Sequence, residues 1–172
     1  MSKCGHFLLV FYGDGKGKTT SALGLTLRVV GHGKRVLFMH FIKKDLGVGE
    51  YLMLKKLENV KYVVLGPGLG ASRDVIIEYA LKGLELSIKL ASEFRPFLTV
   101  LDELGVVVVK HGLDIKIVIE YVDKLLEYSH VLVTGKYMPK ELIERADLVT
   151  EFKCIRHYFR SKVNEPVEGL DF

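Results

Sequence analysis

The strongest constraint on the fold is the alternation of unbroken apolar runs with segments of helical periodicity. Runs of Val, Leu, Ile and Phe without polar alternation are typical of strands in a parallel sheet that is covered on both faces. We therefore predict a doubly wound, mostly parallel α/β fold with flanking helices. The predicted strands are 7–12, 35–42, 61–66, 97–102, 130–135 and 146–152.

Helical periodicity is clearest in residues 74–93 and 114–128, where apolar residues recur at i, i+3 and i+4. Asp114 is placed to cap the second helix, and Pro139 stands where the first turn of a shorter helix would begin. The apolar faces would be Ile77, Ala80, Leu81, Leu84, Ile88 and Ala91 in the first helix, and Ile115, Val118, Ile119, Val122, Leu125 and Leu126 in the second.

The 172 residues show no linker, repeat or low-complexity segment, so residues 1–172 are predicted to form a single domain. The net charge of +4 comes from basic residues spread along the chain, which argues against a nucleic-acid-binding protein. Neither a signal peptide nor a membrane-spanning run is apparent, and we expect a cytoplasmic protein. Cys4 and Cys154 lack zinc-ligand spacing and are predicted to be reduced thiols.

A glycine-rich turn follows the first predicted strand and leads directly into a helical pattern, the context that a phosphate loop requires. Its sequence, GDGKGKTT, has Tyr12 where the common G-x-x-x-x-G-K-[ST] pattern has its first glycine, so the loop is one residue short. Glycines there would let successive N–H groups form a nest for an anion at the N-terminus of the helix. The predicted nucleotide-binding residues are Gly13, Asp14, Gly15, Lys16, Gly17, Lys18, Thr19 and Thr20.

Lys18 would place its charge on the phosphates, and the Thr19 hydroxyl would bind Mg²⁺. Asp102 and Glu103 follow the apolar run 97–101, and carboxylates at the carboxyl end of a strand can hold Mg²⁺ or its waters. Glu103 fits either metal binding or the activation of a water molecule. We therefore predict a phosphate-loop NTPase-like domain with Lys18 and Glu103 as catalytic candidates and with Thr19, Asp102 and Glu103 as metal ligands.

Several further motifs give the chain a resemblance to a known family. These are the short loop, TLRVVGHGKRV (26–36), HFIKK (40–44), GVGE (47–50), VLDEL (100–104), TGKY (134–137), ADLVTEF (146–152) and GLDF (169–172). Together they resemble the ATP:corrinoid adenosyltransferases of the cobalamin pathway, the type built on a phosphate-loop domain.

The resemblance implies transfer of the 5′-deoxyadenosyl group of MgATP to the cobalt of a reduced corrinoid, cob(I)alamin or a precursor, with release of triphosphate. It also implies that ATP lies reversed in the loop, because the attack is at the ribose C5′. Arg28 and Lys43 would contact the nucleotide, with Glu50 and Lys136 as further candidates; Lys136 stands where arginine is expected. The family suggests a homodimer and a reductase that supplies Co(I).

This sequence departs from the family at two places. The first predicted strand begins at about residue 7, without the helical extension that relatives carry before it. The loop 66–73 contains Leu69 and Ala71 but none of the aromatic residues that relatives place below the corrinoid.

Two other functions are compatible with the motifs: a phosphate-loop ATPase or kinase that releases ADP, and a nucleotide-sensing module without catalysis.

Among the histidines, His32 is expected at a helix end and His40 as a satisfied core residue on a buried strand. The remaining histidines share no zinc-ligand spacing.

Overall fold

The computed structural model describes residues 5–44, 47–68, 70–159 and 164–171. Within these residues the strands form one parallel sheet of six, in the order β3-β2-β4-β5-β1-β6. The strands are β1 (Leu8–Tyr12), β2 (Val36–His40), β3 (Val60–Val64), β4 (Leu98–Asp102), β5 (His130–Gly135) and β6 (Leu148–Glu151). The predicted α/β fold is confirmed.

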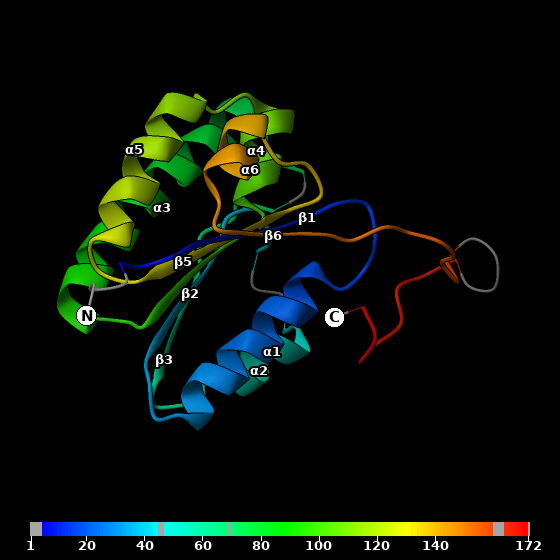
Figure 1. The fold of residues 1–172 in the computed structure, drawn as a ribbon. Coiled ribbons are helices and arrows are strands. Elements are labelled where there is room, and N and C mark those ends of the chain that lie inside the picture. The colour runs from blue at the N-terminus through cyan, green and yellow to red at the C-terminus, as the bar shows by residue number, and fades with distance from the viewer. Residues whose placement is uncertain (1–4, 45–46, 69, 160–163, 172) are drawn as a thin grey trace.

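Helices cover both faces of this sheet (Figure 1). One face carries α1 (Lys18–Gly31) and α2 (Gly49–Leu54), and the other carries α3 (Arg73–Phe94), α4 (Leu104–His111), α5 (Ile115–Leu126) and α6 (Lys140–Arg145). Each face has its own cluster of buried apolar residues, the larger one beneath α3, α4 and α5. Among the described residues, no helix has the length and hydrophobicity needed to cross a membrane.

The expected helix faces and caps agree closely with the structure. Asp114 caps α5 by accepting a hydrogen bond from the Lys116 N–H at 2.9 Å. Pro139 directly precedes α6 as its N-cap residue. In α3 the fully buried face includes Ile76 and so differs slightly from the expected face. Ile77, which was expected on that face, is partly buried and packs against the larger apolar cluster.

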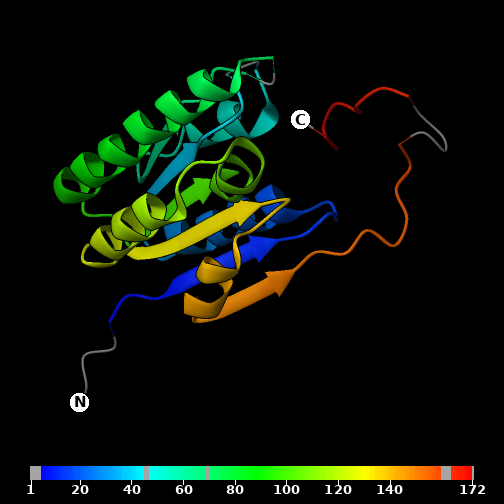
Figure 2. The same ribbon diagram turned by 90° about the horizontal axis from the view of Figure 1, so that it is seen from above.

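The expectation of buried strands was wrong for β6. All of its residues are exposed, because β6 lies at the edge of the sheet and pairs only with β1 among the described strands. Beyond β6 the chain leaves the sheet, and its last described residues turn back toward the carboxyl ends of the strands (Figure 2). This return brings residues 169–171 to the phosphate loop.

Candidate functional site

The loop between β1 and α1 takes its shape from two glycines and from the segment that follows β6. Gly13 and Gly17 have φ values of +116° and +114°, which side chains rarely allow. A Cβ atom on Gly13 would lie 2.3 Å from the carbonyl oxygen of Phe152. The N–H of Gly15 donates to the same oxygen at 2.8 Å. The Gly15 N–H is thus bonded to the chain's own backbone, and the predicted anion nest would use the other N–H groups of the loop.

Lys18, the first residue of α1, is folded back over this loop. Its Nζ donates to the carbonyl oxygen of Gly15 at 2.6 Å. Burial lowers the pKa of Lys18, and the neighbouring charges of Glu103 and Asp102 oppose that effect only in part. An anion held in the loop would offer this half-buried ammonium a stronger partner than the carbonyl oxygen.

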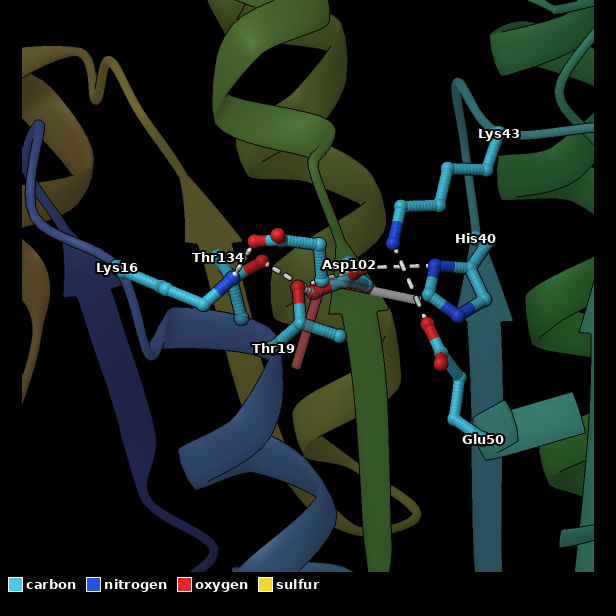
Figure 3. A network of polar contacts seen from close by, with 8 residues as sticks. Lys16, Thr19, His40, Lys43, Glu50, Asp102 and Thr134 are labelled. Atoms are coloured by element: carbon cyan, nitrogen blue, oxygen red, sulfur yellow. Dashed lines mark hydrogen bonds and ion pairs between the residues drawn. The ribbon is translucent and has the colours of Figure 1, made fainter. Parts of the chain in front are cut away.

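Asp102, the last residue of β4, is fully buried and contacts side chains from three other elements (Figure 3). Its Oδ1 accepts hydrogen bonds from Thr134 Oγ1 at 2.6 Å and from Thr19 Oγ1 at 3.1 Å, and Thr19 Oγ1 lies 3.3 Å from Oδ2. The Nδ1 atom of His40 lies 2.7 Å from Oδ2. Burial raises the pKa of Asp102, but the contacts with His40 and Thr134 outweigh it and hold the pKa below the usual range, so the carboxylate is ionised.

Glu103 is the N-cap residue of α4 and has left-handed backbone angles, with φ at +65°. Its N–H donates to Thr134 Oγ1 at 3.0 Å, which holds the strained turn in place. Burial and the charge of Asp102 raise the pKa of the Glu103 carboxyl group. A half-buried carboxyl group with a raised pKa beside a cavity is common at functional sites.

Lys43 and Glu50 form an ion pair of 3.3 Å between the segment after β2 and α2 (Figure 3). Both side chains line the same cavity as Lys18 and Glu103. Lys43 therefore adds its charge to those of Lys16 and Lys18 at the site, and Glu50 limits where an anionic ligand can lie.

These residues surround a cavity of about 510 Å³, within the range of small-molecule sites. One wall is polar and is built by the loop, α1, Lys43, Glu50 and Glu103. The other wall is made of apolar side chains from two helices and of residues at the end of the described chain. It comprises Leu23 and Leu27 from α1, Met53 and Leu54 from α2, and Gly169, Leu170 and Asp171. The cavity thus pairs an anion-binding side with an apolar side.

Most of the predicted site residues meet at this cavity. Those that line it are Lys16, Gly17, Lys18, Thr19, Thr20, Lys43, Glu50 and Glu103, and Asp102 contacts Thr19 behind it. Gly13, Asp14 and Gly15 lie in the loop but do not line the cavity; Asp14 instead accepts a hydrogen bond from the Cys154 N–H at 3.1 Å. Lys136 is close enough to affect the pKa of Lys18, but it lies outside the lining, near the ring of Tyr137.

The structure does not bring Arg28 to the other candidates. It lies in the last turn of α1, about 15 Å along the helix from Lys18 at the usual rise per residue. There it lines a separate cavity of about 320 Å³ with His32, Lys34 and Phe97. Of the two residues noted in the loop 66–73, Ala71 packs against the core cluster and Leu69 lies outside the described residues.

Sequence reasoning missed two side chains of the site, His40 and Thr134. His40 was expected as a core residue, and Thr134 was given no role of its own. Both lie at the carboxyl ends of strands and are the first residues of the motifs HFIKK and TGKY, and that position was the signal available in the sequence.

The donors at Thr19 and Asp102 suit a magnesium ion. A hydroxyl and an ionised carboxylate are hard oxygen ligands, and Mg²⁺ usually completes its shell with water and substrate phosphates. No cluster of three or more His, Cys, Asp or Glu side chains able to hold a metal occurs in the part of the chain described. With Thr19 and Asp102 as donors, most of an octahedral shell is left to water and phosphate, so these two residues suit a metal that arrives with a polyphosphate.

Comparison with known proteins connects this geometry to a family. The sequence profile of "ATP:corrinoid adenosyltransferase BtuR/CobO/CobP" matches residues 5–172. The corrinoid adenosyltransferase of Pseudomonas aeruginosa is 34% identical over 170 residues, covering 96% of this chain and 83% of that protein. That of Escherichia coli K12 is 29% identical over 168 residues, covering 96% and 85%.

A likeness to a solved structure supports the fold alone. The flagellar accessory protein FlaH from Methanocaldococcus jannaschii matches with a TM-score of 0.58 at 12% identity, over 86% of this chain and 71% of that one. The family profile and the relatives confirm the resemblance inferred from the motifs. This chain belongs to the ATP:corrinoid adenosyltransferase family.

Proposed function

We propose that this protein transfers the 5′-deoxyadenosyl group of ATP to the cobalt of a reduced corrinoid and releases triphosphate. The observation that carries the proposal is the cavity in which Lys18, Thr19 and Glu103 meet, found in a chain that belongs to the corrinoid adenosyltransferase family. Relatives named corrinoid adenosyltransferases align over almost the whole chain.

In this reaction the protein must stabilise the leaving group, triphosphate. The electron pair of Co(I) attacks the ribose C5′, the C5′–O bond breaks, and the triphosphate leaves with that bonding pair. Negative charge grows on the departing oxygen, so cations and N–H groups fixed beside it lower the barrier. Lys18 and the N-terminus of α1 supply them in the loop, and Lys16 and Lys43 line the same cavity.

Thr19 and Asp102 would hold Mg²⁺, with Glu103 as a further ligand directly or through water. When bound, the ion would neutralise part of the triphosphate charge. Asp102 suits this role because it is ionised and held in place before any ligand arrives. Co(I) brings its own electron pair, so this chemistry requires no general base, and Glu103 need not act as one.

Attack at C5′ also gives a reason for the short loop. The resemblance implies that ATP lies reversed in the loop, with C5′ turned toward the corrinoid. Leu23, Leu27 and Met53 offer an apolar surface beside the loop for the parts of the substrates that carry no charge.

A homodimer and a reductase that supplies Co(I) are proposals from the resemblance, and light scattering of the purified protein tests the dimer.

The test is an anaerobic assay with MgATP and chemically reduced cobalamin. The light-sensitive spectrum of the adenosylated product and the phosphate products are recorded in the same sample. We expect adenosylcobalamin with one triphosphate per turnover, and loss of both products in Lys18→Ala. Steady release of ADP and phosphate without adenosylation would overturn the proposal and indicate an ATPase.

A further inference from the structure

His40 is a buried polar side chain that the proposed chemistry does not use directly. It ends β2, where the parallel pairing sets it opposite Asp102 on β4, and its side chain is only 1% exposed. Its Nδ1 lies 2.7 Å from Asp102 Oδ2. Within the described part of the chain neither ring nitrogen has a well-aligned hydrogen bond, and the approach of Nδ1 to the Asp102 carboxylate is its short polar contact. The imidazole is therefore directed at a single polar partner, the carboxylate of Asp102.

Aromatic rings restrict the orientation of this imidazole. The ring of Phe38 lies 5.1 Å from it and that of Tyr62 lies 5.3 Å from it, between ring centroids. Such close packing leaves a buried ring few alternative rotamers. Nδ1 is thereby held toward Asp102.

The contacts on Asp102 divide between its two oxygens. Thr134 binds Oδ1 at 2.6 Å, and Thr19 lies within 3.3 Å of both oxygens. His40 makes the shortest contact with Oδ2. If the Thr19 hydroxyl oxygen binds a metal, His40 and Thr134 are the two side chains that keep the carboxylate plane fixed.

We propose that His40 is a positioning residue, which holds the Asp102 carboxylate in the orientation that binds the metal of the metal–ATP complex. Partners behind metal ligands orient those ligands, and their loss typically costs metal affinity. The inference rests on the proposed function, because it assumes that a metal–nucleotide complex binds at this site.

A purely structural role for His40 would depend on its volume and not on its donor. His40→Asn and His40→Leu separate the two, because Asn and Leu share the same branched arrangement of heavy atoms, while Leu keeps about the volume of His and Asn loses part of it. Asn keeps an N–H donor near the position of Nδ1, and Leu has none. Thermal unfolding without ligands measures how far packing alone has suffered in each variant.

The experiment uses Mn²⁺ as the probe, with the full-length protein and ATP. Electron paramagnetic resonance of free Mn²⁺ gives the metal affinity, and calorimetry without metal gives the affinity for ATP alone. We expect His40→Leu to weaken Mn²⁺ binding by roughly 10- to 100-fold, and His40→Asn to recover most of that loss. The affinity for metal-free ATP should stay unchanged in both variants.

Thr99→Val is the matched control. Thr99 lies in the same strand as Asp102, is fully buried, and makes a 2.8 Å hydrogen bond with Ser129. The substitution breaks a buried polar contact away from the cavity, so it should lower stability and leave Mn²⁺ affinity unchanged. An equal loss of Mn²⁺ affinity in Thr99→Val would overturn the inference.

Equal Mn²⁺ binding in His40→Leu and the wild type would also overturn it, as would equal losses in His40→Leu and His40→Asn. Should the Leu variant fail to fold, ¹⁵N imidazole spectra of the wild-type protein with ATP decide, because added Mg²⁺ must shift the Nδ1 resonance of His40. The proposed function fails separately: wild-type protein that binds Mn²⁺ and ATP but releases only ADP and phosphate is no adenosyltransferase, although His40 would still position Asp102.

Discussion

At the scale of single residues, Gly13 of the loop cannot be replaced without a clash, because the backbone of Phe152, distant in sequence, lies against it. Gly13 combines a positive φ with a backbone approach to Phe152 that no side chain could permit. Gly24, inside α1, has nothing within 4 Å of an added Cβ and no positive φ. The phosphate-loop pattern alone explains Gly13 by its backbone angles, but the approach of the segment after β6 adds a second requirement.

Gly13→Ala and Gly24→Ala should therefore change stability in opposite directions. We expect Gly13→Ala to lower the free energy of unfolding by about 1–3 kcal/mol, because it adds both strain and a clash with the Phe152 carbonyl. Gly24→Ala should raise it by about 0.5–1 kcal/mol, since alanine favours a helix interior. Chemical denaturation of the two variants beside the wild type measures both. A Gly13→Ala protein with wild-type stability would show that the segment after β6 does not press on the loop.

At the scale of elements, the sequence predicted long periodic segments well and short ones poorly. The ends of α3 and α5 agree with expectation within two residues because their apolar period is long and clear. Helix α4 was missed: its sequence, LGVVVVKH, is rich in β-branched residues that favour strands, and packing against α3 and β5 overrides that preference. The exposure of β6 was missed because strand order, which the sequence did not reveal, puts it at an edge.

The last described segment, 164–171, is an element that the sequence left without a role. Asp171 accepts hydrogen bonds from Lys16 in the loop, from the Tyr158 hydroxyl at 2.7 Å and from the Val167 N–H at 2.8 Å. These contacts, that with Lys16 foremost, lower the pKa of Asp171. One carboxylate thus ties the end of the chain to the phosphate loop.

The attachment of this segment should depend on pH in a defined direction. Because the pKa of Asp171 is depressed in the folded protein, its contribution is fully present above the ordinary carboxyl pKa of about 4. It is lost as the pH falls toward the depressed value. The ¹³C signal of the Asp171 carboxyl group reports its pKa, and the Val167 amide signal reports the attachment.

Lys16→Ala should raise the pKa of Asp171 toward its ordinary value, because it removes the largest cause of the shift. Tyr158→Phe is the milder companion, since it removes one neutral donor and keeps the ring. A pKa of Asp171 that is the same in Lys16→Ala as in the wild type would rule out the contact between the loop and the end of the chain.

At the scale of the whole molecule, the site depends on strand order more than on any one motif. The order β2-β4-β5 puts Asp102 between His40 and Thr134, at the carboxyl ends of three neighbouring strands. The sequence motifs contain all three residues, but only Asp102 could be given a role at the site, because adjacency in the sheet is not encoded locally. A nucleotide contact for Arg28 was inferred from the resemblance. In the structure Arg28 lies in the last turn of α1, far from the first turn that borders the cavity.

Because α1, α2, Lys43, Glu103 and the end of the chain all line one cavity, a ligand bound there should stabilise the whole protein. A ligand that binds only the folded state adds about 2.7 kcal/mol at a free concentration 100 times its Kd. For a chain of 172 residues this corresponds to a rise in Tm of about 5 to 10 °C. We expect that rise with MgATP, together with slower hydrogen exchange in α1, in α2 and at residues 169–171, because these three parts of the chain all contribute residues to the cavity.

Lys18→Ala separates this effect from nonspecific stabilisation by a polyanion. The variant should retain or slightly exceed the wild-type Tm without ligand, because burial of its ammonium disfavours the charged form in the folded protein. With MgATP at the same concentration its Tm should hardly change, since the variant lacks the proposed contact between Lys18 and the phosphates. Lys34→Ala, at the far end of α1 where Lys34 packs over the Phe97 ring, should keep the full ligand-induced rise. An equal rise in all three proteins would place the nucleotide elsewhere, and the cavity at the carboxyl ends of the strands would then not be its binding site.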